Sequence, residues 1–501
     1  MHTSTTIILI VLCISLIVGR YLQVTLSAGG PNTLLLRKLH AHFPSTQKCT
    51  KKIVLGWNTC IDLLVNASHV SEHLKLKPES SHAVDHENIP HLVALQESLS
   101  YWFSRGGAAE RLMAGEKAES IFEKVVSSAN NDPNGRLRVG GNAALMATSL
   151  AKFGCSVHLG GPVGPTLASR LDERIAFTST QAVNEVIDPV HLILEYQKGQ
   201  MLGDMVSPRA NRYILVHDPL NAQLAGLEPL RNHLREHFEN YDVFVASGLN
   251  QLEALSLSER SERLRAVRSA IYELPLTLPV HLELASMSDP KFVQQMAATM
   301  FPVANSFGLN EEELAFTFQS LNGIFSTDKL TVDMLTGKVP NVDAVVEALE
   351  FLLNKADEWT SAATSGGGHN VRKISRIHFH ALSYHIIADR QVKGRELWAT
   401  DLSQGAAAGS VIATLNACGK HPSYKTQHSL SFLFPNYPAE DELDLLYTDT
   451  CQDRDGVDQG VCVWTHNGIT FSLAPVLVAK HPVNTVGLGD SISSSGLLYS
   501  L

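Results

Sequence analysis

Short apolar segments alternate with helical segments along most of the chain, and this alternation constrains the fold more than any other feature. Each apolar segment ends in a glycine or a polar residue, as is typical of strands buried on both faces. Between them, segments such as 258–272 and 341–353 have helical periodicity. The repeated order of strand and helix predicts an α/β protein with a mostly parallel central sheet flanked by helices. The predicted strands are 52–58, 157–161, 242–248, 278–283 and 374–380.

A ligand site is expected at the carboxyl ends of these strands, because open parallel sheets bind ligands beyond that edge. Ser247, Glu283 and the pair His378/His380 fall there. The spacing of two places both histidines on one side of a strand. Since no third metal ligand lies near them in the sequence, we interpret the pair as packed and hydrogen-bonded.

Length and charge exclude several classes of protein. A chain of 501 residues with 44% hydrophobic residues can bury a large core. The net charge of -10 argues against a nucleic-acid surface, which needs concentrated positive charge. The chain contains no G-x-x-x-x-G-K-[ST] phosphate loop and no dinucleotide fingerprint. Chemistry on a small molecule is therefore favoured.

The N-terminal segment is the one targeting signal. Residues 7–18 are almost wholly apolar, yet they are too few for a comfortable transmembrane span. Residues 1–22 are thus predicted to be a signal peptide or an uncleaved signal anchor. We expect entry into the secretory pathway, with the protein in the lumen of the endoplasmic reticulum, anchored to its membrane through this segment alone, or secreted. The tripeptide Asn66-Ala-Ser68 is a weak glycosylation signal for such a lumen.

Two further segments are expected to be irregular. Residues 23–50 have no sustained periodicity and are predicted to be a linker, and residues 361–371 are predicted to be a flexible surface loop. The seven cysteines include no C-x-x-C spacing, so neither a zinc site nor a dense disulfide framework is indicated. Cys451 and Cys462 flank a turn-rich segment and are either a disulfide or two buried thiols.

The segment Gly487-Leu-Gly-Asp490 has two readings. Glycines let the backbone adopt positive φ and bring amides close to a ligand, and the free amides of a following helix attract anions. Asp490 beside such a site could accept a proton from a hydroxyl that attacks phosphorus. The alternative is that the aspartate merely caps a helix.

Carboxylates elsewhere would supply partners for this motif. His281-Leu-Glu283 and Asn310-Glu-Glu-Glu313 each follow a predicted strand, and hard oxygen ligands suit Mg²⁺. Alternatively, Glu283 and Glu313 are ordinary solvated side chains.

With three more motifs, these segments resemble one family. The motifs are Gly56-x-Asn58-x-x-x-Asp62, the segment 107–111 that contains Glu110, and Gly140-Gly-Asn-Ala-Ala144. In this order, all resemble the ADP-dependent glucokinase/phosphofructokinase family of ribokinase-like sugar kinases, over about residues 52 to 501, and most closely its animal branch.

The resemblance implies a fold and a reaction. It implies a sugar kinase domain at 51–501 with a smaller α/β lid formed by insertions within about 60–115 and 165–217. The implied reaction is Mg²⁺-dependent phosphoryl transfer from ADP to the 6-hydroxyl of glucose, giving glucose 6-phosphate and AMP, by a monomer. The adenine would lie near 476–482. Related animal enzymes continue a little beyond Leu501, so we expect either a shortened final helix or an incomplete sequence.

Residue roles follow from the same resemblance. Asp490 would be the base, with Gly487 and Gly489 forming the anion pocket and Arg212 of the lid reaching the transferring phosphate. Glu110 would favour glucose, because it would repel the phosphate of fructose 6-phosphate. Glu283, Glu313 and Asp490 would hold Mg²⁺ or another divalent ion. The implied sugar-binding residues are Asn58, Asp62, Glu110, Gly140, Gly141 and Asn142.

Two alternatives stay open on the sequence. One is an ATP-dependent sugar kinase of ribokinase-like fold, because no spacing distinguishes ADP from ATP. The other is a catalytically inactive protein of this fold that binds a sugar or a nucleotide.

Overall fold

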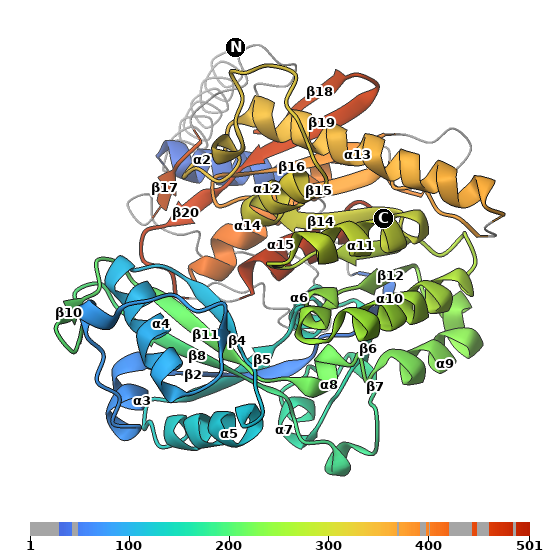
Figure 1. Cartoon of the computed structure of the whole chain (residues 1–501). Coiled ribbons are helices and arrows are strands. Elements are labelled where there is room, and N and C mark those ends of the chain that lie inside the picture. The colour runs from blue at the N-terminus through green and yellow to red at the C-terminus, as the bar shows by residue number, and fades with distance from the viewer. Residues whose placement is uncertain are drawn as a thin grey trace, which may run out of the picture.

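The computed structural model describes residues 30–42, 49–367, 370–390, 397–399, 401–419, 443–447, 460–483 and 487–501. Within these ranges the chain forms a large lobe around a ten-stranded sheet and a smaller lobe around a six-stranded sheet (Figure 1). The predicted signal segment lies outside the described residues. In the part that is described, no helix is both long and apolar enough to span a membrane.

The large sheet is parallel over seven neighbouring strands, from β7 to β15, and antiparallel over the last three. All five predicted strands belong to the parallel part. In spatial order the strands are β18 (Cys462–His466), β19 (Ile469–Pro475), β16 (Tyr384–Asp389), β15 (Arg376–His380), β14 (Ser306–Asn310), β13 (Val280–Glu283), β12 (Val243–Ala246), β1 (Lys52–Gly56), β6 (Ser156–Gly160) and β7 (Ile175–Thr178).

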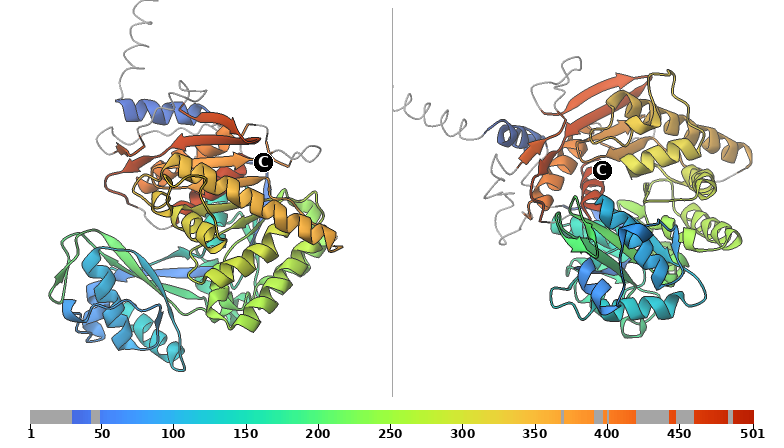
Figure 2. Two further views of the ribbon diagram at one scale, coloured as in Figure 1. Left: turned by 45° about the horizontal axis from the view of Figure 1, so that its top comes forward. Right: turned by 60° about the vertical axis from the view of Figure 1, so that its left-hand side comes forward.

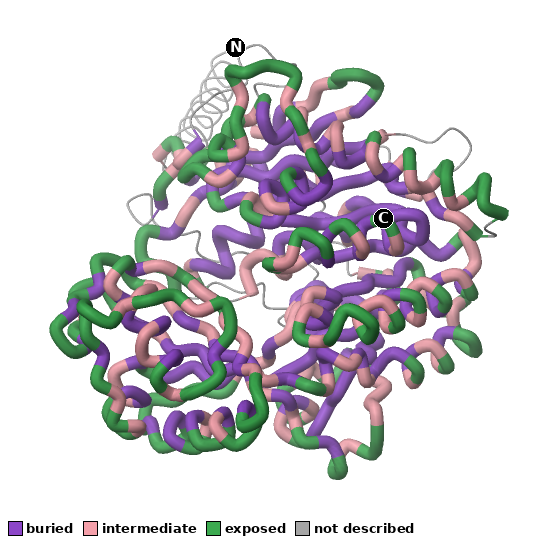
Figure 3. The backbone as a smooth tube through the Cα atoms, in the orientation of Figure 1, coloured by how far each residue is buried: buried purple, intermediate pink, exposed green. Residues whose placement is uncertain are grey.

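Helices cover both faces of the large sheet, and neighbouring residues of one strand enter different cores. Val54 of β1 packs in one core while Ile53 and Leu55 pack in the other, so the strands are apolar throughout. Figure 3 shows these strands as the buried centre of the lobe. One face carries α9 (Leu227–His237), α10 (Leu257–Tyr272), α11 (Pro290–Met300), α12 (Glu311–Ser320) and α13 (Val342–Ser365), and the other carries α6 (Asn142–Lys152), α14 (Ser403–Ala417) and α15 (Leu488–Leu498).

The small lobe interrupts the large one, and the left view of Figure 2 shows it set to one side of the large lobe. Its strands lie in the order β3 (Asn88–Ile89), β4 (Ala109–Met113), β11 (Asn211–Val216), β8 (Val190–Tyr196), β2 (Cys60–Asn66) and β5 (Arg136–Gly140), and its helices are α3 (Ala67–His73), α4 (Leu92–Arg105) and α5 (Ala118–Ala129). The first insertion therefore runs to Gly140 rather than to about 115. In the second insertion, β7 belongs to the large sheet.

Short elements complete the fold. They are α7 (Pro165–Ala168), α8 (Pro219–Ala222), the hairpin of β9 (Met201–Leu202) with β10 (Met205–Val206), and the pair β17 (Leu443–Leu445) with β20 (Leu477–Ala479).

Two expectations of irregular structure are wrong in part. Within the predicted linker 23–50, α2 (Pro31–Ala41) packs on α14 through Leu36 and Leu39, which are fully buried. The spacing of three between these leucines is a helical signal, although a short one. Within the predicted loop 361–371, α13 continues to Ser365, because Ala362 and Ala363 favour continuation of a helix already nucleated by its buried face.

One disulfide is present that the sequence did not suggest. Cys49 and Cys155 are bonded with their Cα atoms 4.7 Å apart, and they precede the neighbouring strands β1 and β6. The predicted pairing of Cys451 with Cys462 lies outside the described residues because Cys451 does, although Cys462 is itself disulfide-bonded.

Candidate active site

Neighbouring strands of the large sheet end in polar side chains at one edge. Glu283 ends β13, Asn310 ends β14 and His380 ends β15. Asn310 then caps α12. The Asn310 side-chain Oδ1 accepts a hydrogen bond from the backbone N–H of Glu313 at 2.9 Å. The backbone N–H of Asn310 donates to Glu313 Oε2, also at 2.9 Å. This reciprocal cap fixes the Glu313 carboxylate at the sheet edge, buried beside β14.

Glu283 is held by hydrogen bonds in a buried position. Ser493 Oγ of α15 donates to Glu283 Oε2 at 2.5 Å, and His281 Nε2 lies 3.0 Å from the same oxygen. His380 Nε2 lies 3.8 Å from Oε1. Burial alone would raise the pKa of Glu283, but His281 and His380 lower it to about 2. This carboxylate is therefore ionised at neutral pH.

The predicted helix start at the Gly487 motif is present. Gly487 caps α15 with φ 72°, a left-handed conformation that favours glycine, and Asp490 lies in the first turn. Gly489 is helical, so its role differs from that of Gly487: a Cβ there would lie 3.2 Å from His380 Cε1. The missing side chain lets the first turn of α15 approach β15.

Three carboxylates meet around this turn. Burial raises the pKa of Asp490 to about 7, and the charge of Glu283 adds to the effect. Burial likewise raises the pKa of Glu313 to about 7, with Glu283 and Asp490 contributing. Their mutual repulsion is the electrostatic environment that a divalent cation relieves. Among the described residues, the three carboxylates do not form a set whose ligand atoms all lie within 4.8 Å of one another.

A chain of amide hydrogen bonds runs from the end of β1 to Asp490. Asn58 Nδ2 donates to Asn142 Oδ1 at 3.3 Å, and Asn142 Nδ2 donates to Asp490 Oδ1 at 2.9 Å. The Asn142 bond lowers the pKa of Asp490 against the effect of burial. Asn58 Oδ1 is buried and has no hydrogen-bond partner among the described residues. Such an orphaned acceptor is expected where a polar ligand binds.

The glycine pair before α6 permits close approach. A Cβ at Gly140 would lie 2.1 Å from Asp62 Oδ1, and a Cβ at Gly141 would lie 2.6 Å from the Asn58 carbonyl oxygen. Gly141 also has φ 81°. Any side chain at these positions would displace Asn58 or Asp62.

One face of the small sheet collects the polar side chains of the small lobe. Asp62 pairs with His191 across β2 and β8, and Ile214 of β11 pairs with Glu110 of β4. Residues at alternate strand positions share a face, so Arg212 lies on it too. The other face carries Leu63, Leu192, Leu215 and their neighbours, which pack with α3, α4 and α5.

This polar face is strongly coupled in charge. Burial and the charge of Glu110 raise the pKa of Asp62, whereas His191 and Arg212 lower it. The net pKa is about 6. Arg212 Nε is buried without a hydrogen-bond partner among the described residues. Glu110 also lines a cavity of about 380 Å³ with Asn250 and Gln251 of the large lobe. The two lobes therefore share a cleft.

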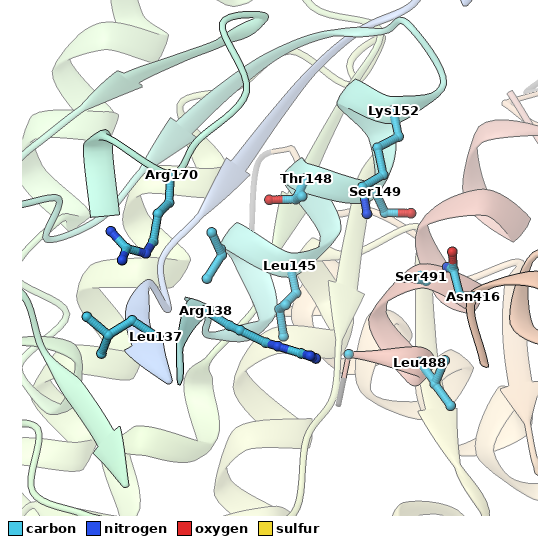
Figure 4. Close-up of a pocket in the computed structure, with 12 residues that line it drawn as sticks. Leu137, Arg138, Leu145, Thr148, Ser149, Lys152, Arg170, Asn416, Leu488 and Ser491 are labelled. Carbon is cyan, nitrogen blue, oxygen red and sulfur yellow. The ribbon is translucent and has the colours of Figure 1, made fainter. Parts of the chain in front are cut away.

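A second cavity, of about 450 Å³, adjoins the start of α15. Its lining includes Gly487, Ser491 and Asn416. It also includes three cationic residues, Arg138, Lys152 and Arg170, among apolar ones such as Leu137 and Leu145. Figure 4 shows Arg138 reaching from β5 toward α15, with Lys152 above it on α6. The cavity thus combines positive charge with a helix N-terminus, both of which favour anions.

The family model for the conserved region of ADP-specific phosphofructokinase and glucokinase matches residues 51–499. The chain belongs to this family. It is 34% identical to an ADP-dependent glucokinase of Bos taurus over 94% of this chain and 89% of that protein. It is 31% identical to a probable ADP-dependent glucokinase of Caenorhabditis elegans over 90% of this chain and 85% of that protein.

Solved structures confirm the fold. A hypothetical ADP-dependent phosphofructokinase from Pyrococcus horikoshii superposes with a TM-score of 0.63 at 17% identity, over 90% of this chain and 98% of that one. The expected ribokinase-like α/β fold is confirmed, and the protein is an ADP-dependent sugar kinase. The family is the one that the six sequence motifs resemble.

The structure brings the predicted residues together in two groups. The first group lies at the edge of the large sheet and consists of Asn58, Asn142, Asp490, Glu283 and Glu313. The second lies on the polar face of the small sheet and consists of Asp62, Glu110 and Arg212. His191 was missed, because the apolar run Leu-Ile-Leu between His191 and Glu195 breaks the alternation that would have indicated a polar strand face.

The histidine pair is only partly as expected. The rings of His378 and His380 lie 5.9 Å apart, so the two share a side of β15. His380 faces Glu283, whereas both ring nitrogens of His378 are buried without a hydrogen-bond partner in the described chain. His378 instead packs against Gly496, where a Cβ would lie 2.3 Å from its Cε1.

Proposed function

We propose that this ADP-dependent sugar kinase is a glucokinase that transfers the β-phosphate of ADP to the 6-hydroxyl of D-glucose, giving glucose 6-phosphate and AMP. The observation that carries the proposal is the chain of hydrogen bonds from Asn58 through Asn142 to Asp490. It connects a buried acceptor suited to a sugar hydroxyl with the carboxylate at an anion-binding helix start. The animal relatives named as glucokinases support glucose as the acceptor.

Asp490 acts as the general base in this proposal. A base with a pKa near 7 can take a proton at neutral pH, and Asn142 holds the carboxylate in one orientation. The amides at the first turn of α15, from Gly487 to Asp490, stabilise charge that develops on the phosphate. Arg212 adds its positive charge when the small lobe closes.

Glu283, Glu313 and Asp490 would hold the magnesium ion or another divalent ion. The ionised Glu283 and the raised pKa values of the other two fit such a cation, which would lower both. When bound, the ion neutralises charge on the transferring phosphate.

The sugar would lie between Asn58 and Asn142 of the large lobe and the polar face that carries Asp62 and Glu110. Gly140 and Gly141 leave the space beside these side chains. Glu110 disfavours a phosphorylated sugar through charge repulsion, which supports glucose over fructose 6-phosphate.

The cavity of about 450 Å³ beside α15 is the proposed nucleotide site. Its cations suit a diphosphate. The adenine would lie near 476–482, because that segment runs along the end of α14, where Asn416 lines the cavity. Thr414 Oγ1 donates to the Leu477 carbonyl at 2.8 Å there.

A coupled assay tests the proposal by pairing ADP or ATP with glucose or fructose 6-phosphate in the presence of Mg²⁺. We expect product only from the pair of ADP with glucose, and that product is glucose 6-phosphate. Turnover with ATP would favour the alternative ATP-dependent kinase, and turnover with fructose 6-phosphate would contradict the role of Glu110. If no pair gives a product, the result would favour the alternative of a catalytically inactive protein that binds a sugar or a nucleotide.

Asp490→Ala tests the base in the same assay. We expect kcat to fall by roughly 10²- to 10⁴-fold while the thermal unfolding curve stays that of a folded protein. Substantial residual turnover would contradict the assignment. Closure of the lobes is tested by small-angle scattering, where glucose should reduce the radius of gyration.

We also propose entry into the secretory pathway, on the apolar segment 7–18 and on the exposed position of Asn66. Asn66 stands at the start of α3, where a glycan would meet solvent. A mobility shift on enzymatic deglycosylation, absent from Asn66→Gln, is the expected result. Recovery of the full-length, unmodified protein in the cytosolic fraction would contradict it.

A further inference from the structure

The small lobe brings together a second set of ligand atoms of a different chemical kind. Cys60, Asp62 and His191 each place one such atom within 4.8 Å of the other two, and all three residues are buried. Cys60 Sγ lies 3.6 Å from Asp62 Oδ1. Among the described residues, they form the one set of three such ligands this close. They come from β2 and β8, so no sequence spacing reveals the set.

The histidine of this cluster is oriented as metal-bound histidines are. His191 Nε2 lies 3.1 Å from Asp218 Oδ2, and Asp218 is itself fixed by the side chain and amide of Asn221. A carboxylate on one ring nitrogen holds the imidazole in place and makes the other nitrogen a better ligand. We therefore assign Nδ1 of His191 as the ligand atom.

Negative charge around the cluster exceeds the positive charge that Arg212 supplies. Asp62, Asp218 and Glu110 all act electrostatically on Cys60, whereas Arg212 is the cation that acts on Asp62 besides His191. A further positive ion would relieve this imbalance.

The kind of ion follows from the ligand atoms. Sulfur, imidazole nitrogen and one carboxylate oxygen suit Zn²⁺ and similar borderline-soft ions, whereas Mg²⁺ prefers oxygen ligands alone. Three protein ligands leave a fourth position open, as in zinc sites that also hold water.

We propose that Cys60, Asp62 and His191 bind a Zn²⁺-type cation, and that this ion and the sugar exclude each other. The exclusion rests on the proposed function, since it requires Asp62 to be a sugar ligand. Binding releases the proton of the Cys60 thiol. The site would make the kinase sensitive to zinc at concentrations where its magnesium site stays occupied by Mg²⁺.

Titration of the full-length protein with Co²⁺ in excess Mg²⁺ tests the site without an activity measurement. A thiolate bound to Co²⁺ gives a charge-transfer absorption band that carboxylate sites lack. We expect this band in the wild-type protein and in the matched control Cys418→Ser, and its loss in Cys60→Ser. His191→Gln keeps a partner for Asp218 and should weaken Co²⁺ binding at least tenfold, with circular dichroism to confirm folding.

The outcomes separate the two parts of the proposal. No thiolate band in the wild-type protein, or a band that persists in Cys60→Ser, overturns the metal site. If the band depends on Cys60 and glucose weakens Co²⁺ binding in proportion to its concentration, both parts hold. A Cys60-dependent band that glucose does not affect supports the metal site and refutes the placement of the sugar at Asp62.

Discussion

Asn142→Ala should shift the pH dependence of turnover, because Asn142 donates one hydrogen bond to the ionised form of Asp490 at 2.9 Å. A hydrogen bond to a charged group contributes about 1.5–3 kcal/mol. At 1.36 kcal/mol for each pKa unit, its loss raises the pKa of Asp490 by roughly one to two units. The starting value is about 7, so the ionised fraction at pH 7 falls by roughly 5- to 50-fold.

The assay is the pH profile of kcat/KM for glucose, whose acidic limb reports the base in the free enzyme. Asn142→Ala should move this limb upward and recover much of its activity near pH 9. Mg²⁺ bound at the proposed site would lower the pKa of Asp490 in both proteins, so the measured quantity is the difference between their profiles. Asn131→Ala, at an exposed position, should leave the limb unchanged. A uniform loss of rate at every pH would refute the proposed hydrogen-bond role.

Three further changes have defined outcomes. Gly140→Ala places a methyl group 2.1 Å from the Asp62 carboxylate and should raise KM for glucose at least tenfold. The control Gly337→Ala, at an open position, should leave KM unchanged. Equal KM values for the two variants would contradict the sugar site. Cys155→Ser opens a disulfide that spans 106 residues and should lower the free energy of unfolding in urea by about 2–5 kcal/mol; a value equal to that of the wild-type protein would contradict this. Glu313→Gln should stabilise the metal-free protein by up to about 3 kcal/mol at pH 8 and little at pH 5, because the carboxyl ionises from about pH 4.5 in the unfolded chain but only near pH 7 in the folded one; a gain independent of pH would refute this.

The large sheet could be predicted because its signal is local. The strand at 280–283 is buried at every position and ends in Glu283, and the apolar residues that mark it lie next to one another in the sequence. The helix start at Gly487 is visible for the same reason, since a glycine with positive φ and a nearby aspartate act within one turn.

The small lobe and the disulfide could not be predicted in detail, because they depend on pairing between distant segments. Asp62 faces His191 only after β2 and β8 align in one register, and neither strand encodes its partner. Cys49 and Cys155 likewise meet because β1 and β6 are neighbours in the sheet. The hydrogen bond between Asn142 and Asp490 joins two helix starts that are far apart in the sequence, so it too appears only in the folded chain.

The disulfide gives the large sheet two edges with different mechanical properties. Cys49 and Cys155 stand at the amino ends of β1 and β6, whereas Asn58 and Glu283 stand at or beyond the carboxyl ends of the sheet strands. The disulfide thus joins the amino ends of the strands, which lie away from the candidate site. The carboxyl ends, which face the small lobe, are not joined by this bond. Formation of the disulfide therefore stabilises the folded chain without a covalent restraint on the strand ends that carry the candidate site.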